Sequence, residues 1–323
     1  MTFVSLLKSS AGRITRVAAG TALGFGLTLS LLTAPGQALA QAPAAVTAPA
    51  PRAEGTGPAL WVIRDADSTI YLFGTVHVLR PTTAWGSDTV DAAFDSASRL
   101  ILEVANPDDQ AAAMPLVQQY GISPETPLSS LLTADEMAAL DVAARSMGMT
   151  AAQLDPLRPW LAALTLSVAP MTKAGYDPQS GVDLLLKARA EAAGMPVDGF
   201  ETIDEQLRIL AGFPEAGQLA LLRSTLEDFA DATVELEKLV SAWAEGDIDT
   251  IESVGVAPMR DESELMYQSI LVNRNVNWAG QIETLLEGSG TVFIAVGAAH
   301  LVGDDSVQAK LAERGIAAER LPE

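Results

Sequence analysis

Two histidines, the only ones in the chain, occupy matching places in the sequence. The motif Gly-x-x-His runs from Gly74 to His77 and again from Gly297 to His300, each time at the end of an apolar run. Imidazole titrates close to neutral pH and is the commonest ligand of transition metals in proteins. We therefore interpret the two motifs as halves of one site, distant in the sequence and joined in space.

Glu103 supplies a carboxylate for the same site, because it stands near the end of the apolar segment Leu100–Val104. Two imidazoles and one carboxylate suit a divalent transition metal such as Mn, Co or Zn. We predict that His77, His300 and Glu103 are its ligands. Such a site leaves positions open for water and substrate, as hydrolysis requires, and a second carboxylate can serve as the base.

Further polar residues are predicted to contact the substrate or the reacting atoms. Arg274 is one of few bases in an acidic chain, and it could bind a substrate carboxylate or stabilise an oxyanion. Glu201 follows a short strand candidate, and we predict that it is catalytic together with Glu103 and Arg274. The predicted substrate-binding residues are Asp183, Asn275 and Tyr267.

Each of these residues also has a structural interpretation. A histidine at a strand end can cap backbone carbonyls, and Glu103 can face solvent. Asp183 follows Ser180 by three residues, where the helix dipole favours an acidic side chain. Arg274 can form an ordinary ion pair, and Glu201 can be solvated. The pairing of the only two histidines favours the functional interpretation.

Two apolar runs must position the histidines. The segments Ile70–Leu79 and Thr291–Asp304 have the composition of strands that are buried on both faces of a sheet. In open α/β sheets, ligands bind beyond the carboxyl ends of the strands, which is where both histidines fall. The structural glycines Gly74 and Gly297 let the backbone leave the strand sharply and leave room beside it.

Shorter elements are predicted around these two strands. A hairpin is expected at 59–64 and 68–73, further strands at 100–104 and 197–200, and an edge strand at 316–321. Helices are expected at 88–98 and 306–314. At 262–271 and 278–286 we predict two helices on either side of a polar corner, Asn273–Asn275.

The middle of the chain changes character. From 107 onward apolar residues recur at helical spacing, and Thr133-x-x-Glu136 and Thr202-x-x-Glu205 are capping boxes. We predict a mixed α/β (α+β) fold with a central, mostly parallel sheet, flanking helices and a large inserted helical lobe at about 107–290.

The first 40 residues have the features of a cleaved secretory signal peptide. A basic start precedes the uncharged apolar segment Val17–Leu32, and Ala38-Leu39-Ala40 is a small-x-small cleavage site. The alternative is a retained membrane anchor. Residues 41–57 are rich in Ala and Pro and are predicted to be a linker, which leaves 58–323 for the folded domain.

Composition limits the classes of partner. The 323 residues carry a formal net charge of −21, which argues against nucleic acid and anionic lipid. The chain has no cysteine, so disulfides and thiolate metal sites are excluded. No run after the signal peptide is long and apolar enough to span a membrane. These features predict a bacterial periplasmic or secreted protein that acts on a peptide or small molecule.

The ordered motifs also resemble a known family. Both Gly-x-x-His motifs, the segment with Glu103, Gly181–Asp183, Phe200–Gln206 and Arg274–Trp278 are similar to those of the TraB/GumN family. The similarity runs from about Leu60 to Val307. This family includes the Tiki proteins, which are metal-dependent proteases. The resemblance implies a fold related to the erythromycin-esterase and ChaN-like group.

Three functions follow from the residues and the resemblance together. The first is an exported metal-dependent hydrolase, a metallopeptidase centred on His77, His300 and Glu103. The second is a non-enzymatic binding protein for a peptide or small ligand, by analogy with family members linked to peptide-pheromone shutdown. The third is an esterase-type hydrolase that uses His77 and a carboxylate without metal. No His-Glu-x-x-His helix is present, so the geometry of established metalloproteases does not transfer.

Overall fold

The computed structural model describes residues 50–53 and 55–322. The predicted signal peptide, 1–40, and the first part of the predicted linker lie outside the described residues. The last part of that linker is attached to the domain: the backbone of Pro51 and Ala53 forms hydrogen bonds with Trp85 and Gly86. Arg52 adds ion pairs to Asp88 and Asp91 at the start of the first helix after the hairpin.

A six-stranded sheet forms the centre of the described residues, in the order β4-β3-β5-β2-β1-β6. The pairs β2–β5, β5–β3 and β3–β4 are parallel, whereas β1 is antiparallel to both β2 and β6. The predicted mixed α/β fold with a mostly parallel sheet is confirmed. The strands are β1 (Leu60–Arg64), β2 (Ser68–Thr75), β3 (Arg99–Val104), β4 (Val197–Glu201), β5 (Gly290–Gly297) and β6 (Glu319–Arg320).

The two apolar runs of the Gly-x-x-His motifs are neighbouring strands. β2 and β5 lie side by side and parallel, with Thr75 opposite Gly297. Both occupy the middle of the sheet, where side chains are covered on both faces, and this is why each run is apolar without alternation. The sheet therefore brings the ends of the two motifs together.

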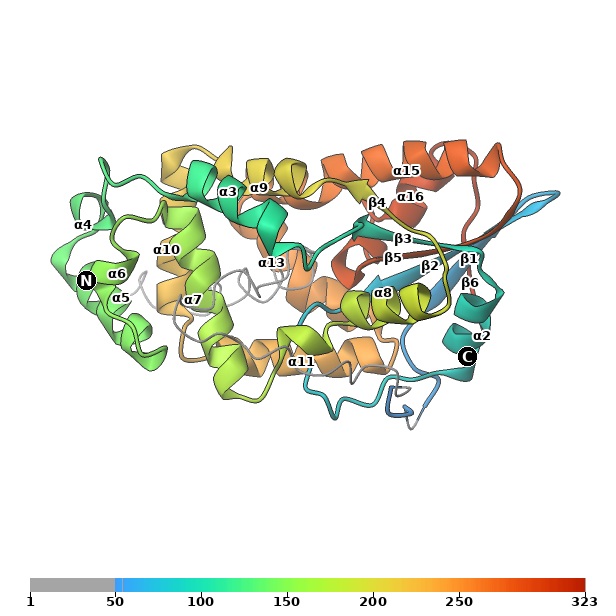
Figure 1. Cartoon of the computed structure of the whole chain (residues 1–323), viewed down its shortest axis with the longest axis horizontal. Helices are drawn as coiled ribbons and strands as arrows, with labels where there is room; N and C mark the ends of the chain where they lie inside the picture. Colours follow the sequence, from blue (N-terminus) through green and yellow to red (C-terminus); the bar gives the residue numbers. More distant parts are fainter. Residues whose placement is uncertain (1–49, 54, 323) are drawn as a thin grey trace, which may run out of the picture.

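Helices cover both faces of the sheet (Figure 1). Leu72 and Ile294 pack on one face with Trp278 and Ile282, which belong to α15 (Asn273–Leu286). The neighbouring side chains along these strands, such as those of Phe73 and Phe293, point to the other face of the sheet. They belong to the larger core on that face. That face is covered by α2 (Asp88–Ser96), α8 (Val182–Ala192) and α11 (Ala232–Ala244).

The predicted helical lobe is present between β3 and β5, except that β4 returns to the sheet within it. Its far end is formed by α4, α5 and α6 (Figure 1). Both predicted capping boxes are formed, at the starts of α5 and α9. The remaining helices are α3 (Gln110–Gly121), α4 (Leu128–Leu131), α5 (Ala134–Ser146), α6 (Ala151–Leu154), α7 (Pro159–Lys173), α9 (Ile203–Ala211), α10 (Glu215–Glu227), α12 (Ile248–Ile251), α13 (Ala257–Glu262), α14 (Glu264–Tyr267) and α16 (Val307–Ala312).

The predicted polar corner at Asn273–Asn275 is wrong. A π-helical segment, η4 (Gln268–Val272), joins α14 to α15 without a break, and the three residues form the first turn of α15. Their polarity reflects different environments: Asn273 is exposed, whereas Arg274 and Asn275 point into the protein and are buried. Within the described residues, no helix is long and apolar enough to cross a membrane.

Candidate active site

The four parallel strands end at one edge of the sheet, and each brings a polar side chain to that edge. The carboxyl ends of parallel strands are the usual place for ligand sites in open α/β sheets. The two histidines and Glu103 are almost completely buried there, at 3% exposure or less. His77 lies two residues after β2, Glu103 near the end of β3, Glu201 at the end of β4, and His300 in the 3-10 turn η5 (Ala298–Leu301) after β5.

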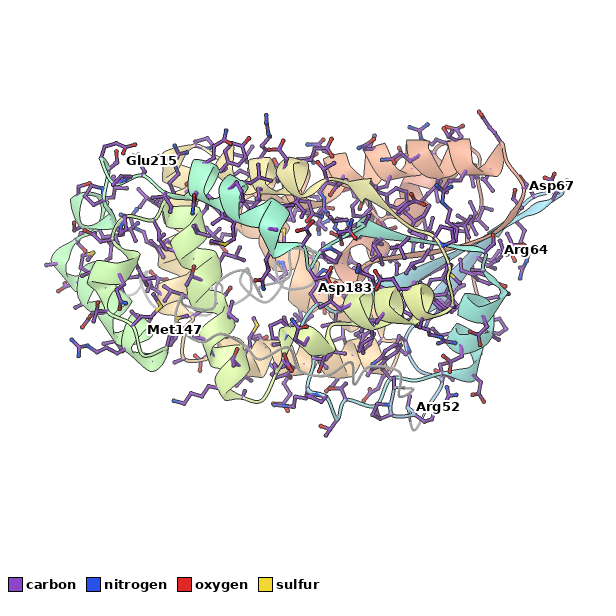
Figure 2. The ribbon with its side chains drawn as sticks, in the orientation of Figure 1. Arg52, Arg64, Asp67, Met147, Asp183 and Glu215 are labelled. Atoms are coloured by element: carbon purple, nitrogen blue, oxygen red, sulfur yellow. The ribbon has the colours of Figure 1, made fainter. Side chains whose placement is uncertain are left out.

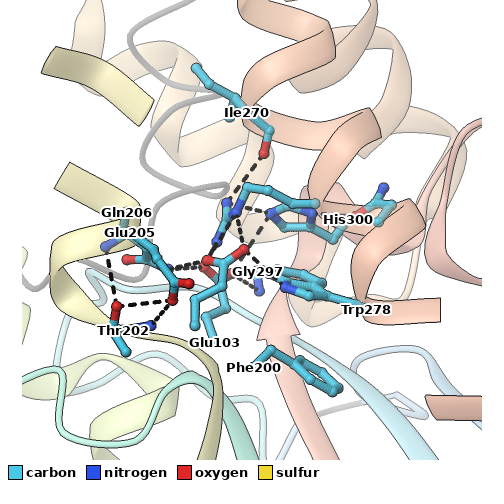
Figure 3. A network of polar contacts seen from close by, with 12 residues as sticks. Glu103, Phe200, Thr202, Glu205, Gln206, Ile270, Trp278, Gly297 and His300 are labelled. Atoms are coloured by element: carbon cyan, nitrogen blue, oxygen red, sulfur yellow. Dashed lines mark hydrogen bonds and ion pairs between the residues drawn. The ribbon is translucent and has the colours of Figure 1, made fainter. Parts of the chain in front are cut away.

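Glu103 stands between the two imidazoles. Its Oε1 lies 4.0 Å from His77 Nε2 and 3.8 Å from His300 Nε2. The same oxygen accepts a hydrogen bond from the Gly297 backbone N–H at 2.7 Å, and Oε2 accepts one from Arg274 Nη2 at 2.6 Å (Figure 3). The structure therefore brings together all three residues that were predicted to be metal ligands.

Glu103 is held as a carboxylate. Burial alone would raise its pKa, but Arg274, the two histidines and the Gly297 N–H outweigh burial and lower the pKa to about 2. A carboxylate with such a low pKa is a weak proton acceptor near neutral pH. Glu103 is accordingly better suited to holding positive charge than to moving protons.

Arg274 uses all five of its N–H donors inside the protein. Nε donates to Glu201 at 2.9 Å, and Nη2 donates to Glu201 at 2.8 Å and to Glu103 at 2.6 Å. Nη1 donates to the Ile270 carbonyl at 3.2 Å and to His300 Nε2 at 3.0 Å. In this arrangement Arg274 positions other groups. Its predicted contact with a substrate stays a prediction and needs one of these bonds to open.

His300 is fixed as one tautomer. Because a guanidinium can only donate, His300 Nε2 must accept, and we assign the ring proton to Nδ1. Nδ1 donates to Asn275 Oδ1 at 2.5 Å, and the Asn275 amide donates to the Asp305 carbonyl. Tyr267 donates to the Asp305 carboxylate at 2.7 Å. Asn275 and Tyr267 thus support His300, and their predicted contact with substrate is untested.

His77 has one nitrogen in use and one available. Nδ1 lies 3.0 Å from Asp183 Oδ1, whereas Nε2 is buried and has no hydrogen-bond partner among the described residues. Asp183 lies in the first turn of α8, at the end of that helix nearest the helical lobe (Figure 2). Burial lowers the pKa of His77, but the carboxylates of Asp183 and Glu103 outweigh burial and raise it above the ordinary value.

Comparison with known proteins places this chain in a family. The family model described as the TraB/PrgY/gumN family matches residues 59–320. The chain belongs to the TraB/PrgY/gumN family. It is 22% identical over 254 residues to the "Uncharacterized protein YbaP" of Escherichia coli (strain K12), covering 78% of this chain and 91% of that protein.

Two further relatives are similar in extent. An "Uncharacterized protein" of Treponema pallidum (strain Nichols) is 23% identical over 260 residues, which covers 76% of this chain and 78% of that protein. The YbaP protein of Shigella flexneri is 22% identical over 254 residues, with 78% of this chain and 91% of that protein covered. No solved structure matches the chain. The site of this TraB/PrgY/gumN protein therefore has to be interpreted from its own geometry.

Two glycines allow close approaches around the site. A Cβ on Gly74 would lie 3.1 Å from Ala298, so Gly74 lets η5 pack directly against β2. Neither Gly74 nor Gly297 has a positive φ, so the predicted room is present at Gly74 without a left-handed turn. A Cβ on Gly181 would overlap the His77 carbonyl, and the next residue, Val182, donates its N–H to Val76. These two contacts hold the start of α8 against the loop that carries His77.

Two residues of the site were not given a role from the sequence. Gln206 is completely buried and donates from one amide nitrogen to both Glu103 and Glu201. Trp278 donates its indole N–H to Glu201 at 2.9 Å, and its ring lies 4.4 Å from that of His300. The sequence did carry one indication of a role for Gln206. It stands next to Leu207 on the buried face of an amphipathic helix, where a polar side chain needs hydrogen-bond partners.

The predicted metal ligands converge, but they do not fit an ion as arranged. Within residues 50–53 and 55–322, no group of three or more His, Asp or Glu side chains is placed to hold one. The physical reason is Arg274, whose Nη1 occupies the lone pair of His300 Nε2. The guanidinium also pairs with both Glu103 and Glu201, as a bound cation would. The metal stays a prediction, and it requires Arg274 to withdraw from His300.

Proposed function

We propose that this TraB/PrgY/gumN protein is an exported hydrolase that cleaves peptide bonds, with His77 as the residue that activates water. The observation that supports the proposal best is the free Nε2 of a buried imidazole whose Nδ1 contacts a carboxylate. A histidine oriented in this way by Asp183 is the arrangement that general bases use.

In the proposed reaction, His77 Nδ1–H donates a hydrogen bond to Asp183. The ring proton therefore stays on Nδ1, and the lone pair is on Nε2. Nε2 removes a proton from a water molecule as the water oxygen attacks the acyl carbon. The imidazolium then returns this proton to the leaving nitrogen as the scissile C–N bond breaks, so His77 ends as it began. Glu103, with its Oε1 at 4.0 Å, stabilises the transient charge on His77.

A metal-assisted form of the reaction is the second candidate. The observation in its favour is again His77, because a carboxylate on the far ring nitrogen is also what metal-ligating histidines have. Mn, Co or Zn would be held by His77, His300 and Glu103 and would make a bound water more acidic. No step is assigned to the ion, since Arg274 occupies His300 Nε2 in the arrangement described above.

Hydrolysis of fluorescein-labelled casein tests the proposal. The purified protein, His77→Ala and Asp183→Asn are compared after treatment with EDTA, with and without added Mn, Co or Zn. Asp177→Asn is the matched control, because Asp177 caps the 3-10 turn just before α8 and its side chain forms no hydrogen bond or ion pair with His77 among the described residues. We expect loss of cleavage in both site variants and normal cleavage in the control.

The EDTA arms separate the two candidates. Cleavage that survives EDTA supports direct activation of water by His77, and cleavage that EDTA abolishes and one metal restores supports the second candidate. Equal activity of His77→Ala and the wild type would contradict both. Casein binding without turnover under every condition would instead indicate the non-enzymatic binding protein.

A further inference from the structure

A groove of about 520 Å³ runs along the outer side of the Arg274–Glu201 pair. One wall is formed by α9 and the loop that follows it, and the other by α14, η4 and the start of α15. Arg274 and Glu201 lie at its base, and Arg274 continues inward to Glu103 and His300. The groove is thus connected to the buried site through Arg274 and Glu201.

One wall carries three polar side chains at four-residue intervals. Ser269, Asn273 and Asn277 all line the groove, and none of these side chains forms a hydrogen bond with another described residue. Their neighbours Asn275 and Trp278 point inward and are bonded to His300 and Glu201. The helix therefore directs one set of polar groups to the site and leaves another set available to a ligand.

The spacing of the asparagines matches an extended chain. Asn273 and Asn277 are four residues apart in an α-helix, which is about 6 Å along its axis. In an extended polypeptide, every second residue recurs after about 6.6 Å. Each amide side chain offers both a donor and an acceptor, so the pair can bond to two successive, equally oriented peptide groups.

The groove ends in an apolar area. Leu265 is 49% exposed and lies one turn before Ser269, and it lines the groove together with Ile209, Phe213 and Pro214. Apolar residues that share an exposed surface inside a groove are a common feature of interaction sites. An apolar side chain of a bound segment would be covered by these residues.

The charges of the groove balance. Glu201 and Glu205 are matched by Arg208 and Arg274, although the whole chain carries a net charge of −21. A neutral lining does not select a strongly charged ligand. It suits an uncharged polypeptide backbone with apolar side chains.

We propose that this groove binds an extended polypeptide segment, with Asn273 and Asn277 hydrogen-bonded to its backbone and Leu265 covering one of its apolar side chains. The inference rests on the proposed function only in treating the bound segment as substrate. Arg274 then lies beneath the segment, where contact with the bound backbone can open one of its bonds to the buried site.

The absence of cysteine makes a direct test available. Asn277→Cys places a single thiol in the groove, and Val276→Cys places one on the same helix at a residue that is 43% exposed and does not line the groove. The labelling rate of each thiol by a fluorescent maleimide is measured with increasing amounts of reduced α-lactalbumin whose cysteines are blocked with iodoacetamide. This probe is unfolded and free of thiols, its blocking groups add no charge, and native α-lactalbumin is the folded control.

We expect the unfolded probe to slow the labelling of Asn277→Cys at least fivefold and that of Val276→Cys less than twofold. Native α-lactalbumin should leave both rates unchanged. Equal protection of the two thiols, or no protection of either, would overturn the inference. Protection that appears without any probe and grows with protein concentration would also overturn it, because it would identify a second copy of this chain as the occupant.

A second variant removes the hydrogen bonds without threatening the fold. Asn273→Ala/Asn277→Ala changes two exposed side chains and should weaken binding of the unfolded probe at least tenfold by fluorescence anisotropy. Unchanged binding contradicts the assignment of these amides. The measurement is repeated in the His77→Ala background. Binding without turnover there and in the wild type would refute the hydrolase and leave the groove standing, whereas casein cleavage without groove protection would do the reverse.

Discussion

At the scale of single residues, the site depends on one guanidinium. Arg274 contacts two buried carboxylates and one imidazole, and its own exposure is 3%. The desolvation of these charges is offset by five hydrogen bonds. Removing the guanidinium would leave Glu103 and Glu201 buried without their counter-ion, which costs far more than the loss of an exposed ion pair.

Arg274→Ala should therefore reduce the free energy of unfolding by about 3–5 kcal/mol. Arg274→Lys should recover only part of this loss, because an ammonium cannot reproduce the planar fork. The control is Arg99→Ala, whose partner Asp198 is about half exposed, and which should cost less than about 1 kcal/mol. Urea unfolding followed by circular dichroism gives these values. A similar loss for Arg274→Ala and Arg99→Ala would refute this view of the site.

Glu103 predicts a specific pH dependence. Its folded-state pKa is lowered to about 2, so its contribution to stability is complete above its ordinary pKa near 4.5 and disappears as the pH falls toward 2. Glu103→Gln should be less stable than the wild type at pH 7 by a few kcal/mol, on the order of 1.4 kcal/mol per unit of pKa shift. The difference should shrink between pH 4.5 and 2 in urea titrations. A constant difference across that range would show that the charge on Glu103 is not what matters.

At the scale of elements, sequence patterns were sufficient for the strands but not for the contacts between their ends. The segments that became β2 and β5 were recognisable because strands in the middle of a parallel sheet are apolar on both faces. The convergence of His77, Glu103 and His300 followed from the rule for strand ends. The bonds of Arg274 could not be predicted, because they depend on how α15 packs against strands that are remote in the sequence.

The start of α15 illustrates the limit. Three adjacent polar residues, Asn273 to Asn275, have the composition of a turn, and local propensity alone would end the helix there. Burial of Arg274 and Asn275 in the site, together with the π-helical segment before them, keeps the chain helical. Tertiary contacts therefore override the local signal at a functional position.

The close packing of the start of α8 against His77 can be tested with substitutions at two glycines. Gly181→Ala introduces a Cβ that overlaps the His77 carbonyl, so the start of α8 must move, and we expect a loss of about 1–3 kcal/mol in stability together with loss of hydrolysis. Gly217→Ala lies inside α10, where a Cβ would be 3.9 Å from Phe213. This control should raise stability by about 0.5–1 kcal/mol. Thermal unfolding measures both changes, and tolerance of Gly181→Ala would contradict the proposed close packing.

The junction of α10 and α11 contains a carboxylate that opposes folding at neutral pH. Burial raises the pKa of Asp228 to about 6, and the neighbouring Glu227, Asp231 and Glu235 add to the effect. Ionisation of a group with a raised acidic pKa costs stability as the pH rises from near 4 to above 6. Asp228→Asn should therefore stabilise the protein at pH 7.5 by about 1–3 kcal/mol, and by progressively less down to pH 4. A stabilisation independent of pH would rule out this explanation.

At the scale of the whole molecule, the site exists only when the sheet is complete. Its residues come from the ends of four strands and from α8, α9 and α15, and the chain between β3 and β5 forms most of the helical lobe. Both histidines follow parallel strands of that sheet, so they could be assigned to one site from the sequence. The groove beside Arg274 could not be predicted in this way. The groove depends on the separation of α9 and α15, which no local pattern encodes.

The shared motif has one last consequence. His77 and His300 end matching Gly-x-x-His motifs after two adjacent strands, yet one ring has an available nitrogen and the other forms hydrogen bonds at both nitrogens. Uniform ¹⁵N labelling of histidine should thus resolve just two rings in this protein. One set of ring-nitrogen resonances should move with an apparent pKa above that of an ordinary histidine. The other set should show the Nδ1–H tautomer that the contacts of His300 require. The spectrum would then distinguish two histidines of the same motif by the hydrogen bonds that each ring forms.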